Sequence, residues 1–307
     1  MSSNVALTPR SSVTINRMNP KSWILGALAA LSLATAVCQA PKPSLLHRTR
    51  QSPTDLEVGG DLINVPHGQT RFVTYADLLT LPQETHTVSD DANFVGPVSL
   101  SGIPLDELAN LLGASPSSAM VIAICDDSYN AHYPTAYLAA HHPLLILRVN
   151  GQPPAHWPLG ADGSAMGPYM ISHHSFTPAF HVLSHADEPQ VPWGVLRLDF
   201  RNEAAVYAPI LPGNPLETRL NAWKGYNIAR QNCFRCHSRN GEGGTKSPTS
   251  WNDIATIATK DPTHFDNYVL HAKDLNPKSQ MAASPNYDDE TLAALRSYFR
   301  TFTEPQP

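Results

Sequence analysis

The chain has 307 residues, a formal net charge of −5 at pH 7 and a hydrophobic content of 42%. This length favours two domains of ordinary size, and the hydrophobic content is enough for two apolar cores. The slightly acidic balance gives no basis for nucleic-acid binding, which a basic surface would indicate. The 28 prolines are nearly twice the average usage of ~5%, which favours short strands and loops over a helical bundle.

Residues 1–40 have the pattern of an export signal. Basic residues precede an uncharged apolar run at 23–37, which is shorter than the ~20 residues that span a membrane. Ala34-Thr35-Ala36 offers a small-residue cleavage site. Cys38 offers an alternative, lipid attachment after cleavage, and an uncleaved anchor is a third possibility. The sequence therefore predicts a periplasmic protein, with membrane attachment through Cys38 or the uncleaved segment as the alternatives.

Residues 41–60 are rich in proline, serine and charge, and they predict a flexible linker. Residues 61–212 predict an α+β domain with a mixed or antiparallel sheet, in which turn signals such as Asn150-Gly151 separate the elements. We expect short helices at 74–79 and 104–112, and strands at 98–100, 120–124, 144–149, 169–171 and 195–200. The sequence carries no phosphate-binding or dinucleotide-binding fingerprint.

Short motifs in this region resemble the molybdopterin-binding fold of the sulfite oxidase family. They follow one another in the family's order: Ser101-Gly102-Ile103-Pro104-Leu105, Asp126-Asp127-Ser128-Tyr129, Leu147-Arg148-Val149-Asn150-Gly151 and Gly167-Pro168-Tyr169. The resemblance covers about 110 residues and implies a fold that could hold a molybdenum cofactor. One departure is that the family's molybdenum-ligating cysteine precedes the first motif, where this chain has residues 86–92 without a cysteine.

Cys125 does not replace the missing ligand, because it lies on a later apolar strand and is typical of a small buried hydrophobe. We therefore do not favour molybdopterin as a cofactor. A fold retained without its cofactor, serving as a docking domain, agrees better with these residues. The region also contains many histidines, including His132, His141, His142, His156, His173, His174, His181 and His185. They are either separate, or His132, His173, His174 and His181 contribute to a metal or quinol-like site.

The motif that carries chemistry is Cys233-Phe234-Arg235-Cys236-His237. Two thiols three positions apart, followed directly by a histidine, are the pattern of covalent c-type haem attachment. Each thiol can add to one vinyl group of haem, and the histidine then ligates the iron. A redox-active thiol pair or half of a zinc site is the alternative. A zinc site would need a second ligand pair, which the isolated Cys38 and Cys125 do not supply.

The flanking segments predict helices on both sides of this motif. Upstream, apolar residues recur at helical spacing: Leu220, Trp223, Tyr226 and Ala229. Downstream, Met281 follows a proline-bearing loop, and Asp288 is the expected N-cap of a closing helix. One face of that helix is marked by Leu292, Leu295 and Phe299. This order of helix, haem motif, loop, methionine and final helix resembles class I cytochrome c over residues 218–307.

The resemblance implies a small all-α domain with one covalent haem c. Cys233 and Cys236 would hold the haem, His237 would be the proximal axial ligand of the iron and Met281 the distal one. Ala282 stands where the family often has proline, which puts the stiffness of that loop in doubt. Two rival sixth ligands, His264 and His271, are expected on the solvated side of a helix that begins at Asp261-Pro262.

Together these patterns predict an exported monohaem c-type cytochrome that carries single electrons between redox partner proteins. The sequence favours an electron carrier over an enzyme, and we assign no catalytic residues. One alternative is a molybdenum-dependent oxidoreductase subunit that passes electrons from a small substrate to the haem. Another is a haem-based sensor. Lys278, Arg235 and Arg239 could surround the haem edge and dock an acidic partner, or simply be solvated.

Overall fold

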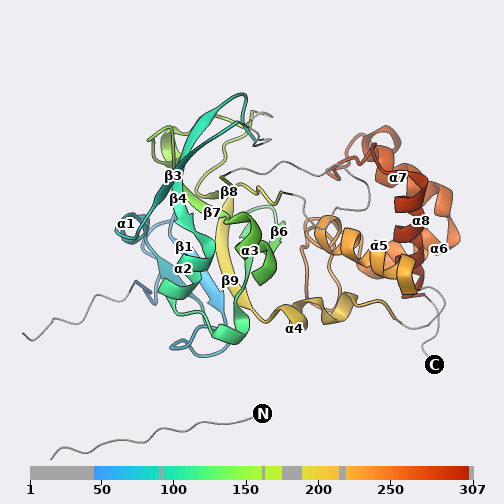
Figure 1. Cartoon of the computed structure of the whole chain (residues 1–307), viewed down its shortest axis with the longest axis horizontal. Coiled ribbons are helices and arrows are strands. Elements are labelled where there is room, and N and C mark those ends of the chain that lie inside the picture. The colour runs from blue at the N-terminus through green and yellow to red at the C-terminus, as the bar shows by residue number, and fades with distance from the viewer. Residues whose placement is uncertain are drawn as a thin grey trace, which may run out of the picture. The chain divides into compact units, whose positions relative to one another are not determined.

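Two β-sheets face each other across the main hydrophobic core, and a group of helices follows them in the chain (Figure 1). The computed structural model describes residues 45–89, 91, 93–160, 163–174, 189–213 and 219–303. The predicted export signal, with Cys38 and the cleavage site, lies outside the described residues. Among the described helices, none combines the length and the apolar character that crossing a membrane requires.

The first sheet has the order β2-β1-β9-β5-β6, with β1 and β9 parallel and the other neighbours antiparallel. Its strands are β1 (Leu56–Gly60), β2 (Arg71–Val73), β5 (Met120–Cys125), β6 (Asn130–Tyr133) and β9 (Val195–Arg201). The second sheet is antiparallel, with the order β3-β4-β7-β8. Its strands are β3 (Glu84–Val88), β4 (Val98–Pro104), β7 (Leu144–Val149) and β8 (Met170–Ser172).

The helices divide into short ones among the strands and longer ones near the C-terminus. The short helices are α1 (Tyr75–Leu79), α2 (Leu105–Leu112), α3 (Thr135–His141), α4 (Glu203–Tyr207) and the 3-10 turns η1 (Pro116–Ser118), η2 (Pro154–His156) and η4 (Ala208–Ile210). The longer helices are α5 (Arg219–Asn232), α6 (Trp251–Lys260), α7 (Pro262–Leu275) and α8 (Asp289–Arg300). The α+β class predicted from the sequence is thus confirmed, with mixed sheets followed by an all-helical region.

The five predicted strands are all present, but the structure adds strands that the sequence analysis missed. β1 lies inside the segment predicted as a linker, and its Leu56 and Val58 are fully buried. Residues Leu56–Gly60 therefore belong to the first sheet rather than to a flexible linker. β3 was missed because its sequence Glu-Thr-His-Thr-Val is mostly polar and mostly exposed, as an edge strand of the second sheet allows.

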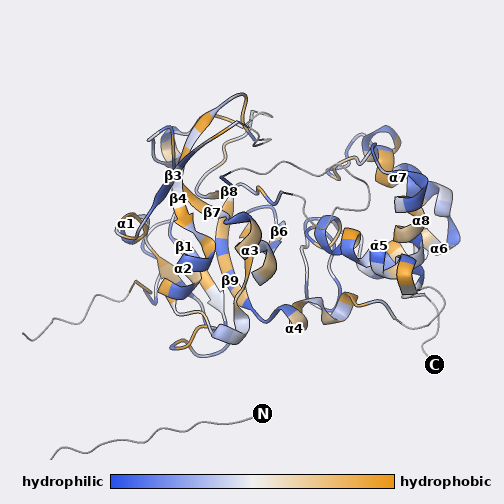
Figure 2. Ribbon diagram, in the orientation of Figure 1, coloured by the Kyte–Doolittle hydropathy of each residue, from blue (hydrophilic) through white to orange (hydrophobic). Residues whose placement is uncertain are grey.

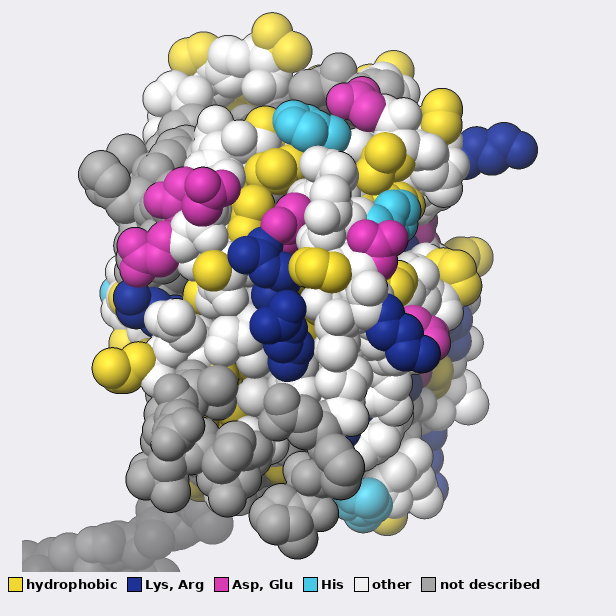
Figure 3. Space-filling view, turned by 90° about the vertical axis from the view of Figure 1, so that its right-hand side faces the viewer, with side chains coloured by type: hydrophobic (Ala, Val, Ile, Leu, Met, Phe, Trp, Pro, Cys, Tyr) yellow, Lys and Arg dark blue, Asp and Glu magenta, His cyan; other side chains and the backbone are white. Residues whose placement is uncertain are grey.

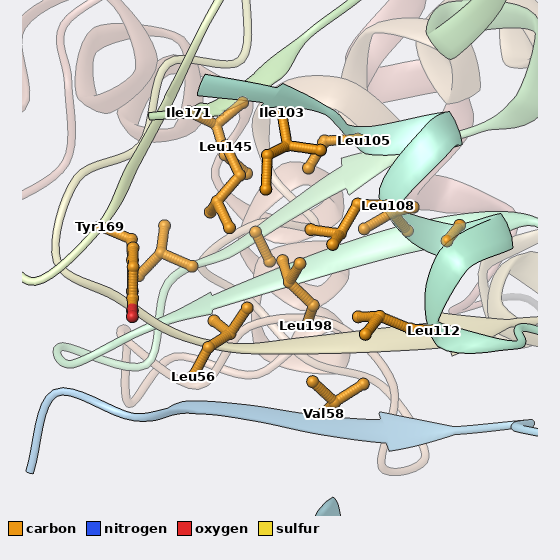
Figure 4. Packing of buried hydrophobic residues seen from close by; sticks show 14 of the residues in the cluster. Leu56, Val58, Ile103, Leu105, Leu108, Leu112, Leu145, Tyr169, Ile171 and Leu198 are labelled. Carbon is orange, nitrogen blue, oxygen red and sulfur yellow. The ribbon is translucent and has the colours of Figure 1, made fainter. Parts of the chain in front are cut away.

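Helix α2 closes the core between the two sheets (Figure 4). Its Leu105, Leu108 and Leu112 recur at helical spacing and are buried against Leu198 of β9 and Leu145 of β7. The helix ends at Gly113, whose φ of 78° suits a glycine cap in the left-handed region. Figure 2 shows that hydrophobic stretches follow the strands that line this core.

Strand β5 is buried on both faces. Because side chains alternate along a strand, one set points to each side of the sheet. Val121, Ala123 and Cys125 belong to the core between the two sheets. Met120 and Ile122 belong to a second core, which they share with the C-terminal helices. The unbroken apolar sequence of β5 therefore reflects two apolar neighbours, and the sheet region and the helical region form one compact unit.

The C-terminal helices pack around an aromatic core in which α5 crosses α8 closely. A Cβ atom added at Gly225 of α5 would lie 2.1 Å from the carbonyl oxygen of Ala294. Of the apolar residues predicted along this helix, Tyr226 and Ala229 are buried, whereas Leu220 and Trp223 are exposed. The absence of a side chain at Gly225 therefore allows the close approach of α5 to α8.

We predict that Gly225→Ala destabilises the protein although alanine is the better helix former. Helix propensity alone would stabilise the variant by about 1 kcal/mol. The clash with Ala294 outweighs this gain, because overpacking a tight contact costs about 1–3 kcal/mol. Chemical unfolding measures the net free energy. The control is Asn227→Ala at an exposed position of the same helix, which should be neutral or stabilising. A Gly225→Ala variant as stable as this control would contradict the close crossing.

Candidate functional site

The pentapeptide Cys233–His237 continues helix α5 by one turn. The amide of Cys233 donates to the carbonyl oxygen of Ala229 over 2.8 Å, and the amide of His237 donates to that of Cys233 over 3.0 Å. The second bond spans four residues, as in an α-helix. Residues three and four apart share one face of such a turn, so the backbone places Cys233, Cys236 and His237 on the same side.

The two cysteines are half-buried thiols rather than a disulfide. Cys233 packs against the apolar core of the helical region. Burial raises the pKa of the Cys236 thiol, whereas the charges of Arg235 and Lys246 act in the opposite direction. The Cys236 thiol is thus protonated at neutral pH, and both thiols are partly accessible. They fit the requirement of two adjacent sulfurs that each form a thioether with one haem vinyl group.

His237 is held in the tautomer that suits iron ligation. Its Nδ1 lies 2.7 Å from the carbonyl oxygen of Thr249, and because a carbonyl only accepts, Nδ1 carries the proton. Burial lowers the pKa of His237, although this hydrogen bond partly offsets the effect, so the ring is neutral. A neutral ring protonated at Nδ1 leaves Nε2 as a free donor for a metal. A carbonyl partner on the other nitrogen is the usual support of a metal-ligating histidine.

Met281 lies in the loop between α7 and α8, half-buried against the same apolar core as Cys233. Its amide donates to Ser279 Oγ over 3.2 Å, and the hydroxyl of Tyr268 on α7 donates to the same oxygen over 3.2 Å. The rival ligands His264 and His271 are both exposed on α7, as the sequence predicted. Burial against the shared core therefore favours Met281 over either histidine as the sixth ligand.

Phe234, between the two cysteines, was not singled out by the sequence analysis. Its side chain is fully buried, stacked on His132 of β6 with ring centroids 5.2 Å apart and edge-on to Trp251 at 5.5 Å. The haem motif is therefore packed directly against the first sheet. An apolar phenylalanine within the haem motif was a signal that this position is buried. The sequence spacing could not show that His132 on β6 is its partner.

The remaining sequence candidates do not gather into one site, although the ring centroids of His141 and His173 lie 6.3 Å apart. Cys125 is buried at the end of β5, and burial raises the pKa of its thiol. His132 and His173 are buried, whereas His142 and His156 are exposed. His181 and His185 lie outside the described residues. Across the described ranges, His, Cys, Asp and Glu side chains form no group of three or more that could hold a metal ion.

The helical region and its motif together define a small haem-binding domain of the c type. Residues 222–303 match the family model for cytochrome c. This match covers less than half of the chain, and it confirms the predicted C-terminal cytochrome c domain. The chain therefore contains an electron-carrying haem protein domain of the kind that binds haem c and works with redox partner proteins.

The rest of the chain has weaker counterparts. No curated protein matches the chain in sequence. Among solved structures it is similar to the sulfane dehydrogenase SoxCD from Paracoccus pantotrophus, with 15% sequence identity and a TM-score of 0.33. That similarity covers 51% of this chain and 40% of the SoxCD chain. Because such a TM-score does not establish a common fold, the resemblance of the middle region to the sulfite oxidase fold stays a prediction.

His132 predicts a loss of stability in acid. Burial, followed by the charge of Arg235, lowers its pKa to about 3, and the charges of Arg201 and Arg230 act in the same direction. The unfolded chain binds this proton near pH 6.5, so between pH 6.5 and pH 3 unfolding takes up protons and stability falls as pH falls. The expected slope is about 1.4 kcal/mol per pH unit for this histidine.

His132→Phe should reduce this acid sensitivity while retaining the stack on Phe234. Denaturant unfolding at pH 7 and at pH 4.5 measures it, and the difference between the two pH values should be smaller in the variant. His173, whose pKa burial also lowers to about 3, contributes equally in both proteins. The exposed His67→Phe is the control and should keep the wild-type difference. An unchanged difference in His132→Phe would show that His132 is protonated in the folded protein.

Proposed function

We propose that the protein is an exported, periplasmic monohaem c-type cytochrome that transfers single electrons between partner proteins. The observation that carries the proposal is the pentapeptide wound into one helical turn, with two thiols and a neutral His237 on the same side. The cytochrome c match over residues 222–303 supports the same function. Export rests on the sequence of residues 1–40, and membrane attachment through Cys38 or the uncleaved segment is the accompanying alternative.

Haem c, when bound, supplies an iron that changes reversibly between the ferric and ferrous states. Cys233 and Cys236 would hold it through thioethers, His237 would donate from Nε2, and Met281 would donate its thioether sulfur. The buried Phe234 and Trp251 exclude water from the core beside the attachment segment. A histidine–methionine pair favours the ferrous state and raises the reduction potential. These residues thus bind, orient and tune the group, while the chemistry is that of the haem.

The sheet region is proposed to act without a molybdenum cofactor, as a domain that positions the cytochrome. Its β5 and β6 contribute Met120, Ile122 and His132 to contacts with the cytochrome core. On the face shown in Figure 3, Lys and Arg side chains lie beside Asp and Glu side chains. Such interspersed charge on that face does not select a strongly acidic or basic partner, and it suits brief encounters with several redox proteins.

The decisive experiment is expression of the full chain in a host that matures c-type cytochromes. The purified protein should be coloured, should keep its haem through acid-acetone extraction, and should contain one iron and no molybdenum per chain. Cys233→Ala/Cys236→Ala should lose the covalent haem, whereas Cys125→Ala should retain it. A colourless wild type would refute the proposal. Stoichiometric molybdenum would instead establish the alternative of an oxidoreductase subunit, and export is checked by recovery from the periplasmic fraction.

Met281→Leu should convert the haem into a site that binds carbon monoxide. Leucine preserves the apolar packing but removes the sulfur, so the ferrous iron loses its sixth ligand. The methionine–iron charge-transfer band at the red end of the spectrum should vanish. The reduction potential should fall by on the order of 0.1 V, a small share of the ~0.8 V range that axial ligands span. Absorption spectra and a redox titration measure these changes.

Met170→Leu is the matched control, because Met170 is a buried methionine in a different core and should leave the spectrum unchanged. If the wild-type ferrous protein already binds carbon monoxide readily, Met281 is not a firm ligand. That result would favour the haem sensor over the electron carrier.

A further inference from the structure

The attachment segment is fastened to the turn between β5 and β6, which comprises residues 126–129. The amide of Asn130 donates to the carbonyl oxygen of Arg235 over 2.9 Å, and its side-chain amide donates to that of Gly243 over 3.0 Å. The amide of Thr245 donates to the carbonyl oxygen of Ser128 over 3.1 Å. The sheet region therefore holds the backbone on both sides of Cys236. These bonds join segments more than a hundred residues apart in the sequence.

Two cations meet at the ring of Tyr129 in this turn. Arg235 donates from Nη1 to the hydroxyl of Tyr129 over 2.8 Å, and its guanidinium lies 5.9 Å from the ring centroid. The ammonium of Lys246 also lies 5.9 Å from this centroid and pairs with Asp127. Both cations are half-buried, so solvent screens them less than fully exposed charges. The aromatic face and the hydroxyl together restrict where the two charges can lie.

These charges lie beside the haem-attachment segment. Arg235 is the residue directly before Cys236, and the ring and hydroxyl of Tyr129 keep its guanidinium and the ammonium of Lys246 close to this segment. A positive charge at this position stabilises added negative charge, and Asp127 partly offsets the contribution of Lys246 through their ion pair. When haem is bound, its reduction would add one electron supplied by a partner protein, with no change of bonds. A fixed cation beside the attachment site favours that electron for the same electrostatic reason.

We infer that Tyr129 is a positioning residue that holds Arg235 beside the haem attachment site and thereby raises the reduction potential of the haem. This inference rests on the proposed function. Without the hydroxyl of Tyr129, Arg235 keeps its hydrogen bond to the side-chain oxygen of Asn232 but loses the contact that fixes its other amino group, so its charge is held less firmly and is screened more by solvent. The sheet region then contributes to electron transfer, because Tyr129 in its β5–β6 turn affects the reduction potential of the haem.

A double-mutant cycle on the haem-loaded full chain tests the inference. Arg235→Gln should lower the equilibrium constant for electron uptake from a redox dye of known potential by about three- to tenfold. This corresponds to a fall in the reduction potential of about 28–59 mV, at 59 mV per tenfold. Tyr129→Phe should weaken it by a smaller factor. In the Arg235→Gln background, Tyr129→Phe should give no further change, because its effect passes through the arginine. Arg235→Lys, which keeps the charge, should restore most of the potential.

Arg71→Gln is the matched control. It removes the same charge from β2, at the opposite edge of the five-stranded sheet from β6, and should leave the potential unchanged. Thermal unfolding of each variant shows whether the fold is retained. An unchanged potential in Arg235→Gln, or an equal effect of Tyr129→Phe with and without the arginine, would overturn the inference alone. A wild type without covalent haem would overturn the proposed function and this inference together.

Discussion

Burial of β5 on both faces is the constraint on which the rest of the structure depends. A strand with apolar side chains on both sides needs an apolar neighbour on each. One face packs in the core between the two sheets, and the other presents Met120 and Ile122 to the helical region. The helices cannot leave that face without exposing these side chains to water, which costs about 25 cal/mol per Å² of apolar surface. The cytochrome core and the core between the sheets are therefore joined through the two faces of β5.

This arrangement brings the haem motif to the sheet and not only to its own helices. Phe234 stacks on His132, and the hydroxyl of Tyr298 on α8 donates to the carbonyl oxygen of Ile210 over 2.6 Å. The chain between the two regions is thus tied to α8 as well. Because β5 pairs on both sides in the sheet and β6 pairs with β5, the attachment segment contacts an ordered part of the sheet. A rigid surrounding suits electron transfer, in which the protein must reorganise little.

The sequence predicted the elements whose limits depend on local patterns. It missed the side-chain positions that depend on contacts between distant residues. Strand β7 has the predicted limits, and α8 begins at the predicted cap Asp288, whose Oδ1 accepts from the amide of Thr291 over 2.9 Å. These elements follow from apolar runs and from capping chemistry within a few residues. The buried face of α5 was predicted only in part: Tyr226 and Ala229 are buried as expected, whereas Trp223 is exposed and Gly225, which meets α8, was missed. Met281 packs against the same core as Cys233 only because the chain folds back over many residues. The resemblance suggested Met281 as the partner of His237, but the sequence could not show that it lies at this core.

The cations around the motif show why charge counts alone do not predict a docking surface. The sequence suggested that Arg235, Arg239 and Lys278 surround the haem edge and attract an acidic partner. In the structure, Arg235 contacts Tyr129, and Arg239 lies 4.0 Å from the ring centroid of Phe302, so both side chains make contacts within the chain. Lys278 is exposed and remains open to solvent. A cation held against an aromatic ring is screened less than an exposed lysine, whose charge acts mainly on encounter rates and is weakened by salt. Under the proposed function, the internal charges would therefore act on the equilibrium of electron transfer, and the exposed one on how often partners meet.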